Sequence, residues 1–349
     1  MSYWKFALRR VLYGVAMYAF LVLLFAVIFN AQMEKTQQSQ IREQLNAERL
    51  SLTQKRVSPE ELKQLMAARE QRLRDKYRLD EPVVSRIVKA TMDTLFFRFG
   101  DSTIIRSQGG ERDVWTILSE KIPRTVMLFT VAILLDIILG ILLGLRNARK
   151  AGGAIDRATS ITTMVVFGLP TWWLAMILIM FLAFKIPIFP SGGLHTVPPP
   201  GGVGYTLDLL YHLALPVLTL VVLGFWGRAY LTRNIVLGTL QEDFIMSARA
   251  RGLSERKILL GHTLRAAAPP IVTMSLLSLL GSFGGALIFE GIFSWPGMGN
   301  LYWVAIQQND IPVLMANLSV TTLIYVGGLV LLDLVYGFLD PRIKVSGKA

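Results

Sequence analysis

Long apolar runs alternate with shorter polar or charged connections along this chain of 349 residues. A bilayer core about 30 Å thick is spanned by a helix of roughly 20 apolar residues. The pattern therefore predicts six membrane-spanning helices, at about 11–29, 124–145, 159–184, 209–231, 268–290 and 313–338. Only helices or closed barrels satisfy their backbone groups in lipid, so the expected fold class is an all-α membrane protein.

The first apolar run has the basic flank of a secretory signal, since Lys5, Arg9 and Arg10 precede it. Its apolar stretch is longer than the roughly 7–15 residues of a signal core, and no small-x-small cleavage site follows. We therefore expect this run to be retained as a membrane anchor.

The basic residues are unevenly distributed, although the chain carries a net charge of +12. Segments 146–158 and 228–265 and the tail 341–349 are rich in Lys and Arg, while 185–208 has only Lys185 and 291–312 has none. The positive-inside rule then predicts a multi-pass protein of the cell membrane with both termini in the cytoplasm. The charge is explained by cytoplasmic loops, and we expect no nucleic-acid partner. The absence of Cys excludes disulfides, thiolate metal ligands and Cys nucleophiles.

Residues 31–121 are expected to form an extracytoplasmic helical segment. Ser58 as N-cap, Pro59 at the first helical position and Glu61 two residues later form a helix start signal. Residues 34–79 are expected to form a helical hairpin or coiled coil, which either docks a partner outside the membrane or packs on itself as a solvated insertion. The remaining divisions are the N-terminus with the first span (1–30), a core of five spans (122–340) and the tail (341–349).

One polar segment interrupts the core, "EDFIMSARARGLSERKILLGHTLRAAAPP", within about 236–270. Glu242 to Ala250 suits a short helix, Gly252 suits a left-handed turn, and Ser254 suits the cap of a second short helix that ends before Pro269 and Pro270. Beside a basic rim, the two helices are expected to present Phe244, Ile245, Ala248 and Leu253. Such a hairpin suits a groove on a cytoplasmic partner, or alternatively anionic lipid headgroups.

The same segment resembles the EAA loop of ABC-importer permeases of the dipeptide/oligopeptide family. Further stretches resemble that family: "KYRLDEPVVSRI", "HLALPVLTL", "EGIFSWPGMGNL" and "LDPRI". The resemblance covers the first span and roughly 74–345, whereas residues 31–73 depart from it. It implies a type I ABC-importer permease core, and a coupling role for the residues Glu242, Phe244, Ala248, Ala250, Gly252 and Leu253.

The resemblance also implies partners. Two cytoplasmic ATPase subunits would bind ATP and Mg, because this chain has no GxxxxGK[ST] phosphate loop. The chain itself is expected to hold no cofactor and to be no enzyme. A second, homologous permease subunit and an extracytoplasmic substrate-binding protein would complete the importer in the lipid bilayer. Peptides are the expected cargo, with oligosaccharides or nickel as alternatives. A stand-alone channel, a secondary transporter, and a scaffold whose working part is the outer segment are more remote alternatives.

Several polar and aromatic residues of the core invite a functional interpretation. A translocation path or outer gate is the hypothesis for Glu290, Phe293, Trp295, Pro296 and Gly297. For Glu290 the alternative is a helix-end carboxylate exposed to water.

Other polar groups in the spans favour structural roles. An ionisable residue inside a span invites a functional hypothesis, but for Asp136 we favour a structural pair with another helix over a transport role. We expect Arg228 to reach the headgroups, Asp333 to bond between helices, and His212 to be hydrogen-bonded rather than a metal ligand. The residues Trp172, Trp173, Trp295 and Trp303 are expected to serve packing or the interfacial belt.

Overall fold

The structure, a computed structural model, describes residues 3–54, 58–281 and 286–339. Helices form nearly all of its regular structure, and in these ranges extended pairing is limited to one bridge between Asp101 and Asp113. The first helices are α1 (Tyr3–Gln54), α2 (Pro59–Lys76), α3 (Val83–Leu95), α4 (Val114–Arg149), α5 (Ala154–Phe167), α6 (Thr171–Ile179) and the π-helix η1 (Met180–Lys185). The later ones are α7 (Val203–Leu240), α8 (Asp243–Ala250), α9 (Glu255–Lys257), the π-helix η2 (Ile258–Thr263), α10 (Leu264–Gly281), α11 (Leu287–Ile292), α12 (Met298–Gln307) and α13 (Ile311–Leu339).

The expectation of an all-α membrane protein is confirmed. Within the described residues, five helical segments are long and apolar enough to cross a membrane: α1, α4, α7, Glu255–Gly281, and Ile311–Leu334 within α13. A sixth crossing results if the bent pair Ala154–Phe167 and Thr171–Lys185 counts as one span. The fifth predicted span, 268–290, is displaced: its helix starts earlier and is described as far as Gly281, residues 282–285 lie outside the described part, and α11 is a separate short helix.

The third predicted span is not one straight helix. Its two halves, α5 and α6, meet at an angle of 100° around Gly168-Leu169-Pro170. Pro170 lacks a backbone N–H, and its ring disfavours helical geometry at Leu169, so the break falls where this tripeptide stands.

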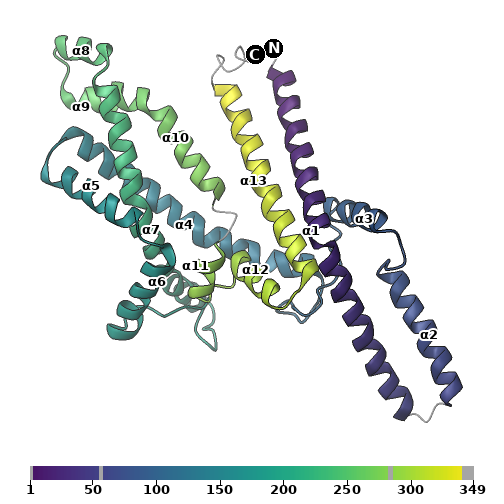
Figure 1. The fold of residues 1–349 in the computed structure, drawn as a ribbon. Coiled ribbons are helices and arrows are strands. Elements are labelled where there is room, and N and C mark those ends of the chain that lie inside the picture. Colours follow the sequence, from purple (N-terminus) through teal and green to yellow (C-terminus); the bar gives the residue numbers. More distant parts are fainter. Residues whose placement is uncertain (1–2, 55–57, 282–285, 340–349) are drawn as a thin grey trace. The chain divides into compact units, whose positions relative to one another are not determined.

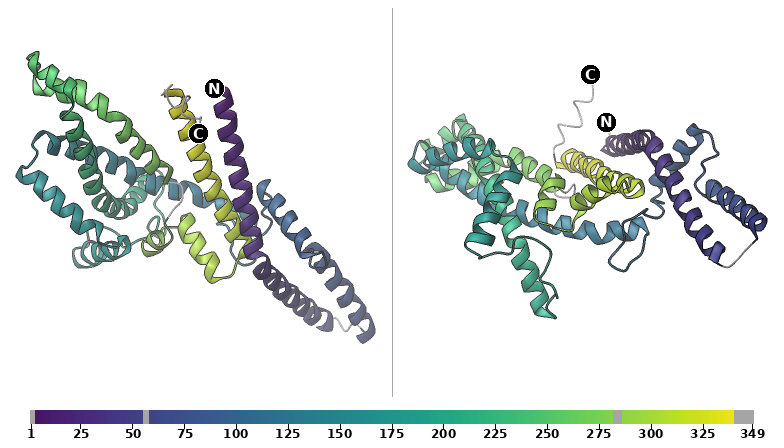
Figure 2. Two further views of the ribbon diagram at one scale, coloured as in Figure 1. Left: turned by 45° about the horizontal axis from the view of Figure 1, so that its top comes forward. Right: turned by 60° about the horizontal axis from the view of Figure 1, so that its bottom comes forward.

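The chain divides into two compact units, Met1–Glu120 with Tyr302–Ala349, and Lys121–Leu301. In the first unit α13 runs alongside α1, as the views of Figure 1 and Figure 2 agree. The Tyr18 and Ser319 hydroxyls share a buried hydrogen bond of 2.7 Å, and Arg10 pairs with Asp333 at 3.1 Å. The expected interhelical role of Asp333 is thereby confirmed.

Helix α1 does not end at the predicted boundary near residue 30 but continues for 52 residues into the insertion. Helix α2 packs back against its far end, with Arg69 paired to Glu48 at 3.1 Å (Figure 1). The Ser58 hydroxyl accepts a hydrogen bond from the Glu61 amide at 3.3 Å, which confirms the predicted cap. The two helices of the expected hairpin are therefore present, and residues 55–57 between them lie outside the described residues.

In the last turn of α2, Arg74 donates at 2.6 Å to Asp80, which follows the helix, and holds the pKa of that exposed carboxyl below its usual range.

The second unit is built around α4 and α7. Near one end of α7 an apolar cluster joins three helical segments, with α4 contributing Ala148, α7 contributing Val236, and α10 contributing Ala267 and Ile271. Near the other end a larger cluster joins α4, α6, α7 and the segment around α11. These two clusters support the two candidate sites.

Candidate coupling hairpin and outer loop

The polar segment folds as a tight turn between α8 and the helical run that begins with α9. Gly252 has φ +76°, a conformation that costs glycine little and other residues more. Its amide donates to the carbonyl of Arg249 at 2.9 Å, and the Leu253 amide donates to the carbonyl of Ala248 at 3.3 Å. This pair of bonds is the Schellman motif, so the left-handed turn predicted at Gly252 is confirmed.

The hairpin has its own small core. Ile245, Ala248 and Ile258 are buried together, with Leu240 and Leu253 packed against them. The expectation that Ile245 and Ala248 are presented to a partner is therefore wrong, because these two side chains seal the hairpin from within. Hydrophobic contact between the ends of a Schellman motif commonly accompanies the turn, and Ala248 and Leu253 provide it here.

The outward face is formed by Phe244 of the predicted set and by Met246, which was not predicted. Phe244 is 44% exposed and Met246 is 62% exposed. Glu242 stands at the N-cap position of α8 with its side chain exposed, and Ala250 and Gly252 are exposed as well. The surface available to a partner therefore consists of the Phe244 and Met246 side chains beside the exposed residues at the two ends of α8.

A basic rim surrounds this face, as predicted. Arg249 pairs with Glu255 at 2.9 Å, and that carboxylate raises the pKa of Arg249, so the guanidinium stays charged. The side chains of Arg251, Arg256 and Lys257 are exposed, and no ion pair is recorded for them among the described residues. The hairpin surface therefore combines exposed apolar side chains with several basic side chains and the acidic Glu242.

The second helix is longer than expected. Ser254 occupies its N-cap position without a side-chain cap bond, and α9, η2 and α10 follow one another without interruption from Glu255 to Gly281. Pro269 and Pro270 lie inside α10 rather than at an end. The hairpin therefore continues directly into a candidate span, so a displacement of α8 would be transmitted to α10.

Two ion pairs tie α7 to its neighbours in the same unit. Asp156 of α5 receives both Arg233 Nε at 2.9 Å and Nη2 at 2.8 Å. Asp136 of α4 receives Arg228 Nε at 2.5 Å, and Arg228 Nη2 donates to Ser278 of α10 at 2.9 Å. The expectation of a structural pair for Asp136 is confirmed, whereas the expectation that Arg228 reaches the headgroups is wrong, because a buried carboxylate holds it.

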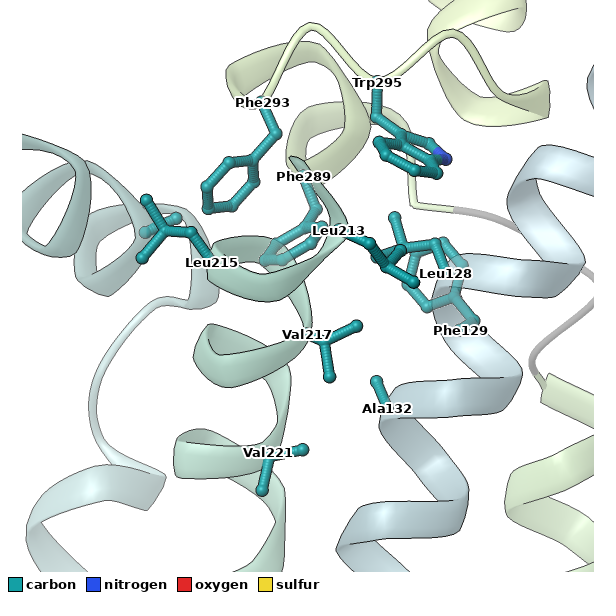
Figure 3. Close-up of a cluster of buried hydrophobic side chains, with 11 residues drawn as sticks. Leu128, Phe129, Ala132, Leu213, Leu215, Val217, Val221, Phe289, Phe293 and Trp295 are labelled. Carbon is teal, nitrogen blue, oxygen red and sulfur yellow. The ribbon is translucent and has the colours of Figure 1, made fainter. Parts of the chain in front are cut away.

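The segment that follows α11 is packed rather than open. The aromatic rings of Phe293 and Trp295 are fully buried. They belong to one apolar cluster with residues of α4 and α7, in which Trp295 lies toward Leu128 and Phe293 lies on the side of Leu215 (Figure 3). The Trp295 ring nitrogen donates to the carbonyl of Arg124 at 3.0 Å.

Glu290 organises this loop from inside. It is fully buried and accepts hydrogen bonds from the Thr125 hydroxyl at 2.8 Å and the Asn300 amide at 3.0 Å. A side chain at Gly297 would meet the Glu290 carboxylate and the Thr125 hydroxyl, so only glycine fits there, and Pro296 beside it is half-buried. The water-exposed carboxylate considered for Glu290 is therefore wrong. None of these side chains is arranged as the open lining of a path within this chain, and their part in a gate stays a prediction.

Sequence reasoning missed one buried carboxylate of the first unit. Asp310 is fully buried and accepts from the Ser102 hydroxyl at 2.6 Å and from the amides of Ile104 and Ile105 at 3.0 and 3.1 Å. It also stands just before α13 and accepts from the Val313 amide at 3.4 Å. An Asp followed by "IP" is a recognisable helix start, and that signal would have found it.

His212 is buried, and its Nδ1 lies 2.9 Å from the carbonyl of Asp208. This confirms the expected hydrogen-bonded role. Within the described ranges no group of three or more His, Cys, Asp or Glu residues is placed to hold a metal ion.

The sequence of this core matches a known family model. Residues 136–345 match the binding-protein-dependent transport system inner membrane component, which is well over half of the chain. The chain belongs to this family. The match covers α5 to α13 together with the hairpin and the outer loop.

Individual relatives extend the similarity. The oligopeptide transport system permease protein AppB of Bacillus subtilis is 31% identical over 270 residues, which cover 77% of this chain and 83% of that protein. The dipeptide transport system permease protein DppB of the same organism is 31% identical over 272 residues, 78% of this chain and 83% of that protein. The metal-staphylopine import system permease protein CntB of Staphylococcus aureus is 28% identical, with 78% and 82% covered.

Among solved structures, the inward-facing MetNI methionine ABC transporter gives a TM-score of 0.47 at 16% identity. It covers 65% of this chain and 99% of that chain.

Proposed function

We propose that this chain is the permease subunit of an ATP-driven importer and forms half of a pathway for peptides. Membership of the transport family gives the class of protein. The names of the oligopeptide and dipeptide permease relatives support the cargo.

The hairpin is proposed to receive the force of ATP hydrolysis. The observation that carries this is its construction: a sealed core of Ile245, Ala248 and Ile258 leaves Phe244 exposed on a rigid turn. A partly exposed aromatic ring within a polar rim is a typical anchor of a protein interface. The apolar cluster beneath the hairpin and the continuous run into α10 would carry its displacement to α4, α7 and α10.

The proposed partners follow from this role. Two cytoplasmic ATPase subunits hold ATP and Mg and receive the hairpin, while this chain holds neither and catalyses no reaction. A second permease subunit completes the pathway, and an extracytoplasmic binding protein delivers the cargo. The basic hairpin then faces the cytoplasm, as do both termini.

A different cargo is the second candidate. The metal-staphylopine permease protein is 28% identical over a similar share of the chain, so family membership alone does not select peptides. An oligosaccharide or another small solute would use the same coupling hairpin.

The first experiment is purification of the chain from its native membrane in mild detergent, with identification of each co-purifying protein. An ATPase pair, a second permease and a binding protein are expected, and the ligand carried by the binding protein would name the cargo. A chain that purifies alone and transports by itself in proteoliposomes would contradict the proposal.

Two variants make this test specific. Phe244→Glu places a charge on the proposed anchor and is expected to abolish recovery of the ATPase. Val197→Glu places the same charge on another exposed apolar residue, which is 86% exposed in the 185–208 connection, and should leave recovery unchanged. Equal ATPase recovery from both variants would remove the hairpin from the interface.

A further inference from the structure

Helix α3 carries an exposed apolar stripe. Val84, Val88, Met92 and Phe96 follow one another at intervals of four, which places them on one side of the helix. Their exposed fractions are 72%, 48%, 53% and 67%. A contiguous stripe of this kind is unusual on a surface that meets water and marks contact with something apolar.

The depth of this helix is set by its neighbour in the same unit. α3 packs against α1, and between them lies an apolar groove of about 270 Å³. The groove is lined by Ala19, Phe20, Leu23, Val88, Thr91, Met92 and Leu95. The three α1 residues fall inside the apolar run at 11–29, so this part of α3 lies at the depth of hydrocarbon once α1 spans the membrane.

The basic side chains of α3 are paired with carboxylates, one of which lies just after the apolar run of α1. Arg86 pairs with Glu34, which follows the apolar run of α1, at 2.9 Å. Lys89 pairs with Glu81 at 2.6 Å. An apolar stripe with paired charges beside it is the construction of a helix that lies in a membrane interface.

We propose that α3 is a membrane-interface helix and that hydrocarbon chains of the bilayer lipid cover its stripe and enter the groove beside Phe20 and Val88. Phe20, Leu24 and Val27 of α1 are also exposed and lie in the same apolar run as the groove residues of α1, which favours lipid as the occupant. The inference goes beyond the proposed function and holds for any cargo. The proposal places α3 in the bilayer, although α3 belongs to the segment 31–121, which is expected to lie outside the cytoplasm.

The absence of Cys from the chain makes a direct test possible. Single Cys variants carry a nitroxide spin label in the complex as it purifies, reconstituted in lipid nanodiscs. Val88→Cys probes the groove, Phe20→Cys is the reference for lipid, and Lys63→Cys on α2 is the reference for water. Oxygen is expected to relax the label at position 88 several-fold more than a water-soluble nickel complex does. The label at position 20 should behave in the same way, and the label at position 63 should show the opposite preference.

Two outcomes would overturn the inference. Preferential relaxation by the nickel complex would place α3 in water, and weak relaxation by both reagents would show that a protein subunit covers the stripe. Val84→Cys repeats the measurement on the stripe at a position outside the groove. The result therefore does not depend on whether the label at position 88 disturbs the groove. Import activity is not a readout of this test, and its outcome is therefore distinct from that of the peptide proposal.

Discussion

Two short segments of the second unit, the hairpin around Gly252 and the loop after α11, solve the same packing problem in opposite ways. The hairpin is held by a backbone turn at Gly252 and a small core, which leaves its polar and aromatic side chains at the surface. The loop after α11 is held from within by the Glu290 carboxylate, which turns its polar and aromatic side chains inward. The hairpin therefore leaves side chains free for contact, whereas the loop keeps its side chains inside.

The largest effect is expected in the outer loop. Glu290→Ala leaves the Thr125 hydroxyl and the Asn300 amide buried without an acceptor, and we expect a loss of about 3 kcal/mol in the free energy of unfolding. Thermal unfolding in detergent measures it. Glu290→Gln keeps an acceptor oxygen and should lose clearly less, whereas equal losses would show that hydrogen bonding is not what holds the loop.

A smaller loss is expected in the core of the hairpin. Ile245→Ala removes a fully buried side chain from a small cluster, with an expected cost of about 2 kcal/mol confined to the hairpin. Hydrogen exchange should report faster opening of α8 with unchanged protection of α7. Unchanged protection throughout would mean that the cluster does not stabilise the hairpin.

The turn itself comes next. Gly252→Ala places a side chain at φ +76°, with an expected cost of about 1–2 kcal/mol. Gly252→Pro and Glu242→Lys are expected to uncouple ATP hydrolysis from uptake while insertion into the membrane persists. Reconstituted importer with paired ATPase and uptake measurements tests this, and normal coupled uptake in both variants would disprove the coupling assignment.

The smallest effect on stability is expected at the exposed ring. Phe244→Ala should change the free energy of unfolding by less than about 0.5 kcal/mol, as surface substitutions usually do. It should nevertheless weaken ATPase binding roughly tenfold or more, as loss of an interface anchor does. A stable variant with unchanged ATPase affinity would erase the contrast between the two segments.

The amino-acid sequence alone determined the membrane fold and the position of the hairpin. Apolar runs as long as the bilayer is thick can hardly be anything but spans, and Gly252 after a short helix specifies its turn locally. The break at Gly168-Leu169-Pro170 interrupts a span that was predicted as one helix, although its cause is equally local, because proline acts on its own neighbours. Such features depend on residues close together in the chain.

The tertiary structure alone decided which side chains face inward. The sequence does not tell that Arg228 meets Asp136, 92 positions away, or that Glu290 meets Thr125, 165 positions away. It also does not tell that Ile245 and Ala248 point into the hairpin while Phe244 points out, because all three suit either face of a short helix. The fold decides which segments come together, and this determines which partner a charged side chain meets and which way an apolar side chain points. The local sequence pattern carries no information about it.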